Sequence, residues 1–231
     1  MNLQQYNISE NNFEQCIKCT VCTVYCPVVP LNEDFPGPKH AGPDGERLRL
    51  KDPDFFEKSL KYCLNCKRCE VACPSGVRIG DIIQSARIKH NTNTPKLRDM
   101  LLANTDFVGR MSTPLAALVN MTLKLKPVKA VMDSVLKIDH RRVFPNYARQ
   151  TFESWYRKHA AEQQQNFRKH VSYFHGCYAN YNYPQLGKDL VKVMNAAGYG
   201  VHLLEKEKCY GVALISNGLI NQATRQGKHN I

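Results

Sequence analysis

The sequence predicts a mainly α-helical protein whose last part, residues 171–231, changes to an α/β pattern. Three observations support this fold class. Eight of the ten cysteines lie in two copies of one short pattern near the N-terminus. Between residues 79 and 168 apolar residues mostly recur three or four positions apart, which is the period of an α-helix. From residue 171 two short apolar runs flank a helical pattern, as in a parallel α/β unit.

The two cysteine motifs share the spacing C-x2-C-x2-C-x3-C, and a proline follows each. This pattern is typical of proteins with two [4Fe–4S] clusters, in which the fourth cysteine of each motif serves the other cluster. Because proline disfavours helical geometry in the residue before it, Pro27 and Pro74 turn the fourth sulfur away from the other three. We therefore expect two crossed ligand sets: Cys16, Cys19, Cys22 and Cys73 for the first cluster, and Cys63, Cys66, Cys69 and Cys26 for the second.

Other uses of clustered cysteines fit this pattern less well. Structural zinc sites usually show two separated C-x2-C pairs, or cysteines mixed with paired histidines. A disulfide scaffold is disfavoured because residues 1–15 are polar and acidic, without the basic and apolar parts of an export signal. We therefore expect a reducing, cytoplasmic compartment. The sequence shows no flavin or nucleotide fingerprint, and the cysteine motifs make electron transfer the leading expectation.

The charge balance indicates which partners to expect. The formal net charge is +12, and two clusters with their thiolates would lower it to about +8. Such a basic protein suits an anionic membrane surface or an acidic partner subunit, whereas no motif for binding nucleic acid is present. No run of residues approaches the roughly 20 apolar residues that a membrane span needs.

The cluster region is expected to be helical. Residues 27–45 are rich in proline and glycine, which predicts a loop. Short helices are then expected over Glu46–Leu50 and Asp54–Tyr62, the second with Leu60 and the pair Phe55/Phe56 on its buried face. The apolar spacing over Ile79–Lys89 predicts one amphipathic helix. The first domain, residues 1–95, is therefore expected to be a helical variant of a two-cluster domain.

A helical connecting region is expected over residues 96–168, after a polar joint at 91–96. Apolar residues from 115 to 138 follow a helical period that Pro127 interrupts, and residues 114–149 carry seven Lys or Arg against two Asp. An apolar side with basic neighbours can lie on an anionic membrane. The alternative is an ordinary helix pair that packs on the body of the protein. A further helix is expected over Phe152–Arg168.

The last domain, residues 171–231, is expected to begin an α/β fold. Val171–Cys177 is expected to be a strand that runs into a glycine turn. A helix over Leu186–Ala197 and a second strand over Val201–Leu204 complete a β-α-β unit. The chain ends soon after this unit, so we expect the α/β domain to be incomplete.

Several segments between the motifs resemble one family. The segments are Gly45–Asp52, Lys61–Pro74, Ile79–Ile83, Leu136–Arg142, Phe174–Cys177 and Pro184–Leu190. They resemble the C subunit of anaerobic glycerol-3-phosphate dehydrogenases. This resemblance implies an alpha-helical ferredoxin domain followed by a cysteine-rich module. It also implies an iron–sulfur subunit without a catalytic site of its own. Such a subunit takes electrons from the A and B flavoprotein catalytic subunits and passes them toward membrane quinone, such as menaquinone.

The same resemblance implies a peripheral position on the cytoplasmic side of the bacterial inner membrane, with residues 114–142 as the candidate contact. The alternatives are an iron–sulfur subunit of a related glycolate or lactate oxidase or of a heterodisulfide-reductase-like complex, or a non-redox metal-binding domain.

The cysteine-rich module departs from the pattern that the resemblance implies. Cys177 and Cys209 match its first two cysteine positions, but Tyr210 stands where a second, adjacent cysteine is expected. No later C-x2-C pair follows. We therefore expect Cys177 and Cys209 to be free thiols without a cluster of their own.

Overall fold

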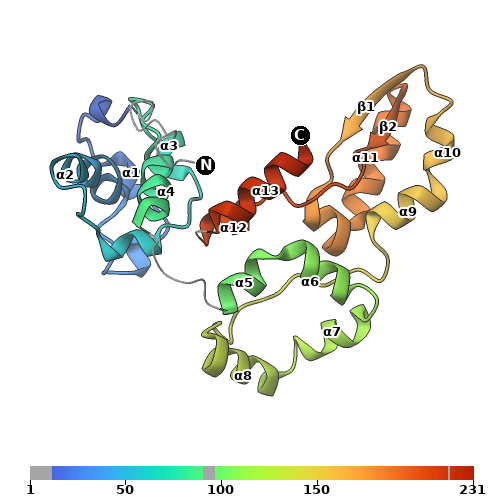
Figure 1. The fold of residues 1–231 in the computed structure, drawn as a ribbon, viewed down its shortest axis with the longest axis horizontal. Coiled ribbons are helices and arrows are strands. Elements are labelled where there is room, and N and C mark those ends of the chain that lie inside the picture. The colour runs from blue at the N-terminus through green and yellow to red at the C-terminus, as the bar shows by residue number, and fades with distance from the viewer. Residues whose placement is uncertain (1–11, 91–96, 218) are drawn as a thin grey trace. The chain divides into compact units, whose positions relative to one another are not determined.

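The structure, a computed structural model, describes residues 12–90, 97–217 and 219–231 (Figure 1). Most of residues 1–15, and the whole polar joint expected over 91–96, lie outside these residues. The chain divides into two compact units, Met1–Thr94 and Pro95–Ile231. The second unit therefore contains both the connecting region and the α/β segment.

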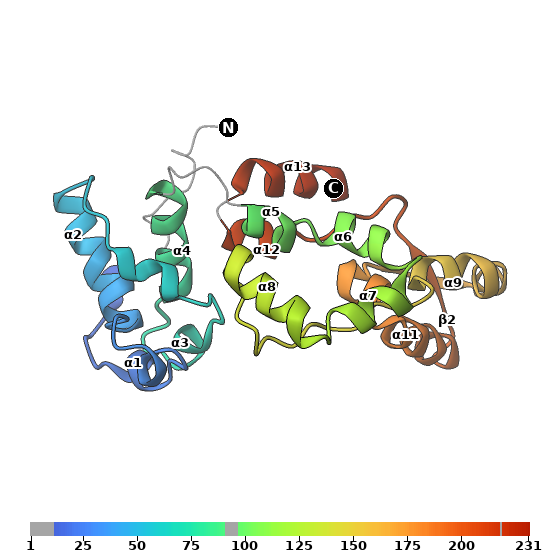
Figure 2. The same cartoon turned by 90° about the horizontal axis from the view of Figure 1, so that it is seen from below.

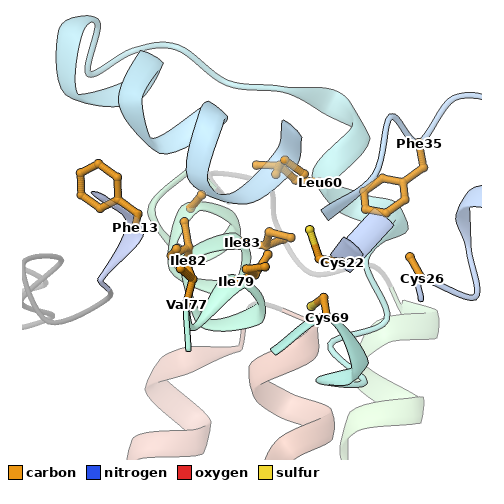
Figure 3. Packing of buried hydrophobic residues seen from close by; sticks show 12 residues of the cluster. Phe13, Cys22, Cys26, Phe35, Leu60, Cys69, Val77, Ile79, Ile82 and Ile83 are labelled. Atoms are coloured by element: carbon orange, nitrogen blue, oxygen red, sulfur yellow. The ribbon is translucent and has the colours of Figure 1, made fainter. Parts of the chain in front are cut away.

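The first unit consists of short helices around one hydrophobic core. Its elements are 3-10 helices at Phe13–Gln15, Val29–Leu31 and Lys58–Tyr62, a π-helix at His40–Asp44, and α-helices α1 (Val21–Val24), α2 (Gly45–Lys51), α3 (Arg68–Val71) and α4 (Ile79–His90). The core side of α4 has the predicted helical spacing, and its four apolar residues Ile79, Ile82, Ile83 and Ala86 are buried. Leu60, Phe35 and three of the motif cysteines also belong to this core (Figure 3).

The loop predicted over residues 27–45 is wrong for its second half. Helical backbone runs without a break from Pro38 through the π-helix into α2. Pro38 is the first helical residue of this stretch, so its missing N–H costs no helical hydrogen bond. Pro43 lies inside the π-helical turn. Gly42 serves close packing rather than a turn, because a Cβ there would lie 2.8 Å from Ile79 Cγ2 on α4.

The helix predicted over Asp54–Tyr62 is shorter in the structure. Only Lys58–Tyr62 is helical, since the Asp52 carboxylate accepts the Asp54 N–H at 3.1 Å and forms a turn there. Leu60 is fully buried as predicted, whereas Phe56 is 45% exposed. The helices predicted over Glu46–Leu50 and Ile79–Lys89 are confirmed by α2 and α4.

The second unit combines a series of helices with a two-stranded parallel sheet. Its elements are α5 (Leu97–Ala103), α6 (Thr105–Ser112), α7 (Ala116–Thr122), α8 (Lys126–Leu136), α9 (Phe152–His159), α10 (Ala161–Gln164), β1 (Lys169–Tyr173), a π-helix at Tyr178–Asn182, α11 (Pro184–Ala196), β2 (Tyr199–Leu203), α12 (Val212–Ser216) and α13 (Ile220–Asn230). The strands pair in register from Lys169 with Tyr199 to Tyr173 with Leu203, and α11 connects them. The predicted β-α-β unit is thus confirmed.

The core of the second unit lies between α9, α11 and the sheet. Phe152 is fully buried, and Gly187 on α11 leaves room for its ring, because a Cβ there would lie 2.6 Å away. The helix predicted over Phe152–Arg168 breaks at Ala160 into α9 and α10. A smaller apolar cluster of Ala103, Leu214 and Leu219 joins α12 to α5 (Figure 2).

The middle segment has the predicted interruption. Residues 123–125 separate α7 from α8, and Pro127 lies in the first turn of α8, where proline is favoured. After α8 the chain runs back past α7. Asn120 on α7 makes two hydrogen bonds to the backbone of Tyr147, at 2.8 and 2.9 Å, which holds the returning chain in place.

Candidate iron–sulfur site

The two cysteine motifs adopt the same local backbone. The residues two and four positions after the first cysteine have a left-handed conformation in both copies: Lys18 and Thr20 in the first, Asn65 and Lys67 in the second. Such residues turn the chain sharply without glycine at a modest cost in strain. In both motifs the short helix that follows, α1 or α3, begins directly after the second left-handed residue.

The eight motif cysteines line two separate hollows in the first unit. One hollow, with an empty volume of about 350 Å³ that is partly open to solvent, is lined by Cys26, Cys63, Cys66 and Cys69. The other, of about 290 Å³, is lined by Cys16, Cys19, Cys22 and Cys73. Each hollow therefore brings three cysteines of one motif together with the fourth cysteine of the other motif. Figure 3 shows Cys22, Cys26 and Cys69 at the side of the hydrophobic core.

The sulfurs of each set are partly shielded from water. Cys22, Cys26 and Cys69 are buried, while Cys19 and Cys66 are exposed. Burial raises the pKa of Cys22, and burial together with the charge of the neighbouring Cys63 raises the pKa of Cys69 to about 12. Several crowded thiols resist ionisation together, so a cation that binds them must supply the compensating charge.

The donors fit iron–sulfur clusters. Each hollow is lined by four cysteines, and four cysteine thiolates are the ligand set of a [4Fe–4S] cluster. Two backbone N–H groups donate to these sulfurs, Asn65 to Cys63 Sγ and Val77 to Cys73 Sγ, both at 3.4 Å. Such N–H donors to sulfur are among the features that set the reduction potential of a bound cluster.

Side chains of α4 and α3 brace the second motif. Lys67 forms ion pairs with Glu70 at 2.9 Å and with Asp81, and Glu70 also accepts the Asp81 N–H at 3.1 Å. The ion pair with Lys67 lowers the pKa of Asp81 although burial acts against it. Gly80 lies under this loop, because a Cβ there would be 2.8 Å from Glu70 Oε1.

Arg87 on α4 is a second basic group at this motif. It donates to the Cys63 carbonyl at 3.1 Å, which places a positive charge beside a predicted ligand. Sequence reasoning missed the roles of both Gly80 and Arg87. Periodicity assigns them to a helix but does not show which loop that helix contacts.

A second feature, which we call the apolar helix surface, lies on the second unit. It consists of large apolar side chains on and beside α6, α7 and α8, each 44% to 70% exposed: Phe107, Met111, Leu115, Leu118, Met121, Leu125, Val131 and Val135. These residues recur at three- to four-residue spacing within each helix, so each helix presents an apolar side to solvent. Exposed basic residues, including Lys124 and Lys126, lie among them in the sequence. No helix in the described part of the chain has the length and hydropathy of a membrane span.

Two protein-family models match the two end regions of the chain. The 4Fe-4S dicluster domain matches residues 12–77, and the cysteine-rich domain matches residues 171–231. The C subunit of anaerobic glycerol-3-phosphate dehydrogenase from Escherichia coli (strain K12) is 58% identical over 97% of this chain and 56% of its own length. The probable glycolate oxidase iron-sulfur subunit of Bacillus subtilis (strain 168) is 23% identical over 97% of this chain and 54% of its own.

The chain thus spans about half the length of these relatives. The B subunit of fumarate reductase (CoM/CoB) from Methanothermobacter marburgensis is a more distant relative, 26% identical over 89% of this chain and 36% of its own length. No solved structure matches the chain. The resemblance seen in the sequence is therefore confirmed: over nearly its whole length this chain is similar to the C subunit of anaerobic glycerol-3-phosphate dehydrogenase, with a 4Fe-4S dicluster domain and a cysteine-rich domain in the same order as the two parts predicted.

Proposed function

We propose that this protein is the iron–sulfur electron-transfer subunit of an anaerobic glycerol-3-phosphate dehydrogenase. In this function the flavoprotein catalytic subunits oxidise glycerol 3-phosphate, and this chain conducts the electrons toward a membrane quinone. The observation that carries the proposal is the grouping of the eight motif cysteines around two hollows in a chain 58% identical to such a subunit.

We propose that each hollow holds one [4Fe–4S] cluster on crossed ligands, as the spacing predicts. Cys16, Cys19, Cys22 and Cys73 would hold the first, and Cys63, Cys66, Cys69 and Cys26 the second. A bound cluster supplies one-electron storage. The exposed positions of Cys19 and Cys66 would leave one edge of each site accessible to a redox partner, while the buried cysteines keep the rest of it out of water.

The alternative with a specific observation in its favour is an iron–sulfur subunit that serves a 2-hydroxy acid such as glycolate, because the glycolate oxidase relative also matches 97% of the chain. The large difference in identity, 23% against 58%, favours glycerol 3-phosphate.

The decisive experiment mixes the cluster-loaded protein with a purified glycerol-3-phosphate dehydrogenase flavoprotein pair and its substrate under anaerobic conditions. We expect the visible absorbance of the clusters to bleach within the turnover time, because each cluster accepts one electron. Bleaching only by a glycolate-oxidising flavoprotein would refute the proposal.

We also propose that the protein attaches peripherally to the cytoplasmic side of the inner membrane through the apolar helix surface. Apolar side chains enter the interface and nearby lysines meet anionic lipid, each worth about 1 kcal/mol near such a surface. The exposure of these side chains on three consecutive helices supports this assignment over a helix pair packed on the protein body.

Vesicle flotation tests the membrane proposal. Replacement of Lys124, Lys126 and Lys129 by Glu should weaken binding to vesicles rich in anionic lipid about a hundredfold or more, from the loss of three such attractions. The control variant makes the same charge change at Lys158, Lys192 and Lys228, which are exposed elsewhere on the second unit. Equal binding by both variants would contradict attachment through this surface.

A further inference from the structure

The two cysteines outside the motifs are close neighbours in the structure. Cys177 follows β1 and Cys209 precedes α12, 32 positions later in the chain. Their Sγ atoms lie 3.5 Å apart. A disulfide bond needs about 2.05 Å between the sulfurs, so a movement of roughly 1.5 Å would join them.

Two carboxylates hold the cysteine segments in this position. Glu207 accepts the backbone N–H groups of His175 at 3.1 Å and Gly176 at 2.6 Å, which ties the loop before Cys209 to the loop before Cys177. Asp106 on α6 accepts the N–H of Cys209 at 2.7 Å. The pair is therefore fixed from both sides by hydrogen bonds that do not involve the sulfurs.

The two thiols form a hydrogen bond with each other in a largely buried setting. Cys209 is only 4% exposed and Cys177 is half-buried. The hydrogen bond between the thiols raises the pKa of Cys177, to which burial also contributes, and the same hydrogen bond lowers the pKa of Cys209. With the lower pKa, the Cys209 thiol loses its proton more readily than the Cys177 thiol.

Metal binding is a weaker use of this pair. Within the described ranges, no third cysteine, histidine or carboxylate joins the two sulfurs in a group that could hold an ion. The residue after Cys209 is Tyr210, whose ring lies over Gly176, because a Cβ on that glycine would be 3.4 Å from it. A tyrosine ring thus covers the side of the loop next to the pair.

We propose that Cys177 and Cys209 are a dithiol–disulfide pair that exchanges two electrons with low-molecular-weight disulfides, separately from the motif cysteines. The Cys177 thiol, the more exposed of the two, loses its proton to water, and its thiolate attacks one sulfur of the small disulfide. One small thiolate leaves and takes up a proton. The Cys209 thiol then loses its own proton to water, and its thiolate attacks the Cys177 sulfur, which expels the second small thiolate to take up the other proton. The protein thiols are oxidised to one disulfide, and the small disulfide is reduced to two thiols.

The experiment uses the cluster-loaded full chain in glutathione buffers of varied ratio under anaerobic conditions. After acid quenching and alkylation with N-ethylmaleimide, trypsin releases Cys177 in the peptide His170–Lys188 and Cys209 in the peptide Cys209–Arg225. We expect these two peptides to appear linked, and the ratio of linked to reduced peptide should rise in proportion to the glutathione disulfide concentration divided by the square of the glutathione concentration. That dependence distinguishes an internal disulfide from a mixed disulfide, which follows the glutathione disulfide concentration divided by the first power of the glutathione concentration.

Single replacements provide the matched controls. In Cys209→Ser and Cys177→Ser the remaining cysteine should form only a mixed disulfide, and the iron content should stay that of the unchanged protein. Mixed disulfides alone in the unchanged protein, or no oxidation in buffers that oxidise an exposed reference dithiol, would overturn the proposal. So would a metal ion lost with Cys177→Ser. None of these results depends on which flavoprotein supplies electrons to the clusters.

Discussion

Removal of the Glu46 carboxylate should destabilise the first unit strongly, because it leaves a buried guanidinium without its counter-charge. Arg49 Nε donates to Glu46 Oε2 at 2.8 Å, and the two side chains are only 3% and 6% exposed. Arg49 Nη2 also donates to the carbonyls of Ala41 at 3.3 Å and Gly42 at 3.4 Å. The pair thus lies where the π-helix continues into α2, against the part of the chain that packs on α4.

The size of the effect follows from this burial. Removing one partner of a buried ion pair costs about 3–5 kcal/mol, because the other charge stays desolvated and unpaired. The two carbonyl contacts of Arg49 remain in Glu46→Ala, so we expect the lower half of this range, about 3 kcal/mol. A domain is stable by only about 5–15 kcal/mol in total. With a urea m-value of about 2 kcal/mol per molar, the unfolding midpoint should fall by roughly 1.5 M.

Urea unfolding of the cluster-loaded protein, followed through the visible absorbance of the clusters, measures this shift. Glu14→Ala is the matched control, since Glu14 is exposed in the same unit, and its shift should stay within about 0.5 kcal/mol. The double variant Glu46→Leu with Arg49→Met should recover most of the loss, because apolar residues can replace a buried pair at little cost. A midpoint for Glu46→Ala equal to that of Glu14→Ala would refute the reasoning.

Two glycines give further predictions from close packing. Gly80→Ala should place a Cβ 2.8 Å from Glu70 Oε1, which should loosen the second cysteine loop and speed cluster loss in air. Gly227→Ala is the control, because a Cβ there has no atom within 4 Å and should not change the rate of cluster loss. Equal rates of bleaching in the two variants would contradict this prediction. Gly109→Ala should place a Cβ 2.4 Å from the Tyr181 ring and lower the thermal stability of the second unit by about 1–3 kcal/mol, as overpacking does. Calorimetry that finds no change in this transition would show that the ring moves aside freely.

The sequence predicts those parts of the fold that depend on local pattern. The buried side of α4 could be assigned in advance because Ile79, Ile82 and Ile83 follow the helical period. The cysteine spacing likewise predicts which residues gather in the first unit. Residues 38–44 were not predictable in the same way. Their proline and glycine content indicates a loop, but Gly42 is there because α4 comes within contact distance.

Long-range contacts account for the parts of the site that the sequence does not show. Asp106 and Cys209 are 103 positions apart, and no pattern connects them until the structure places the start of α6 beside the loop before α12. Glu207 is an ordinary acidic residue in the sequence, yet it joins the two cysteine loops through backbone N–H groups. Pairing of this kind depends on the tertiary fold, which sequence periodicity does not encode.

The central claim is that the eight motif cysteines hold two [4Fe–4S] clusters that carry electrons. Iron analysis of the anaerobically purified protein, combined with electron paramagnetic resonance of the dithionite-reduced form, tests it most directly. The account predicts about eight iron atoms per chain and a spectrum of two interacting one-electron centres. Zinc in place of iron, or a single isolated centre with about four iron atoms, would contradict it.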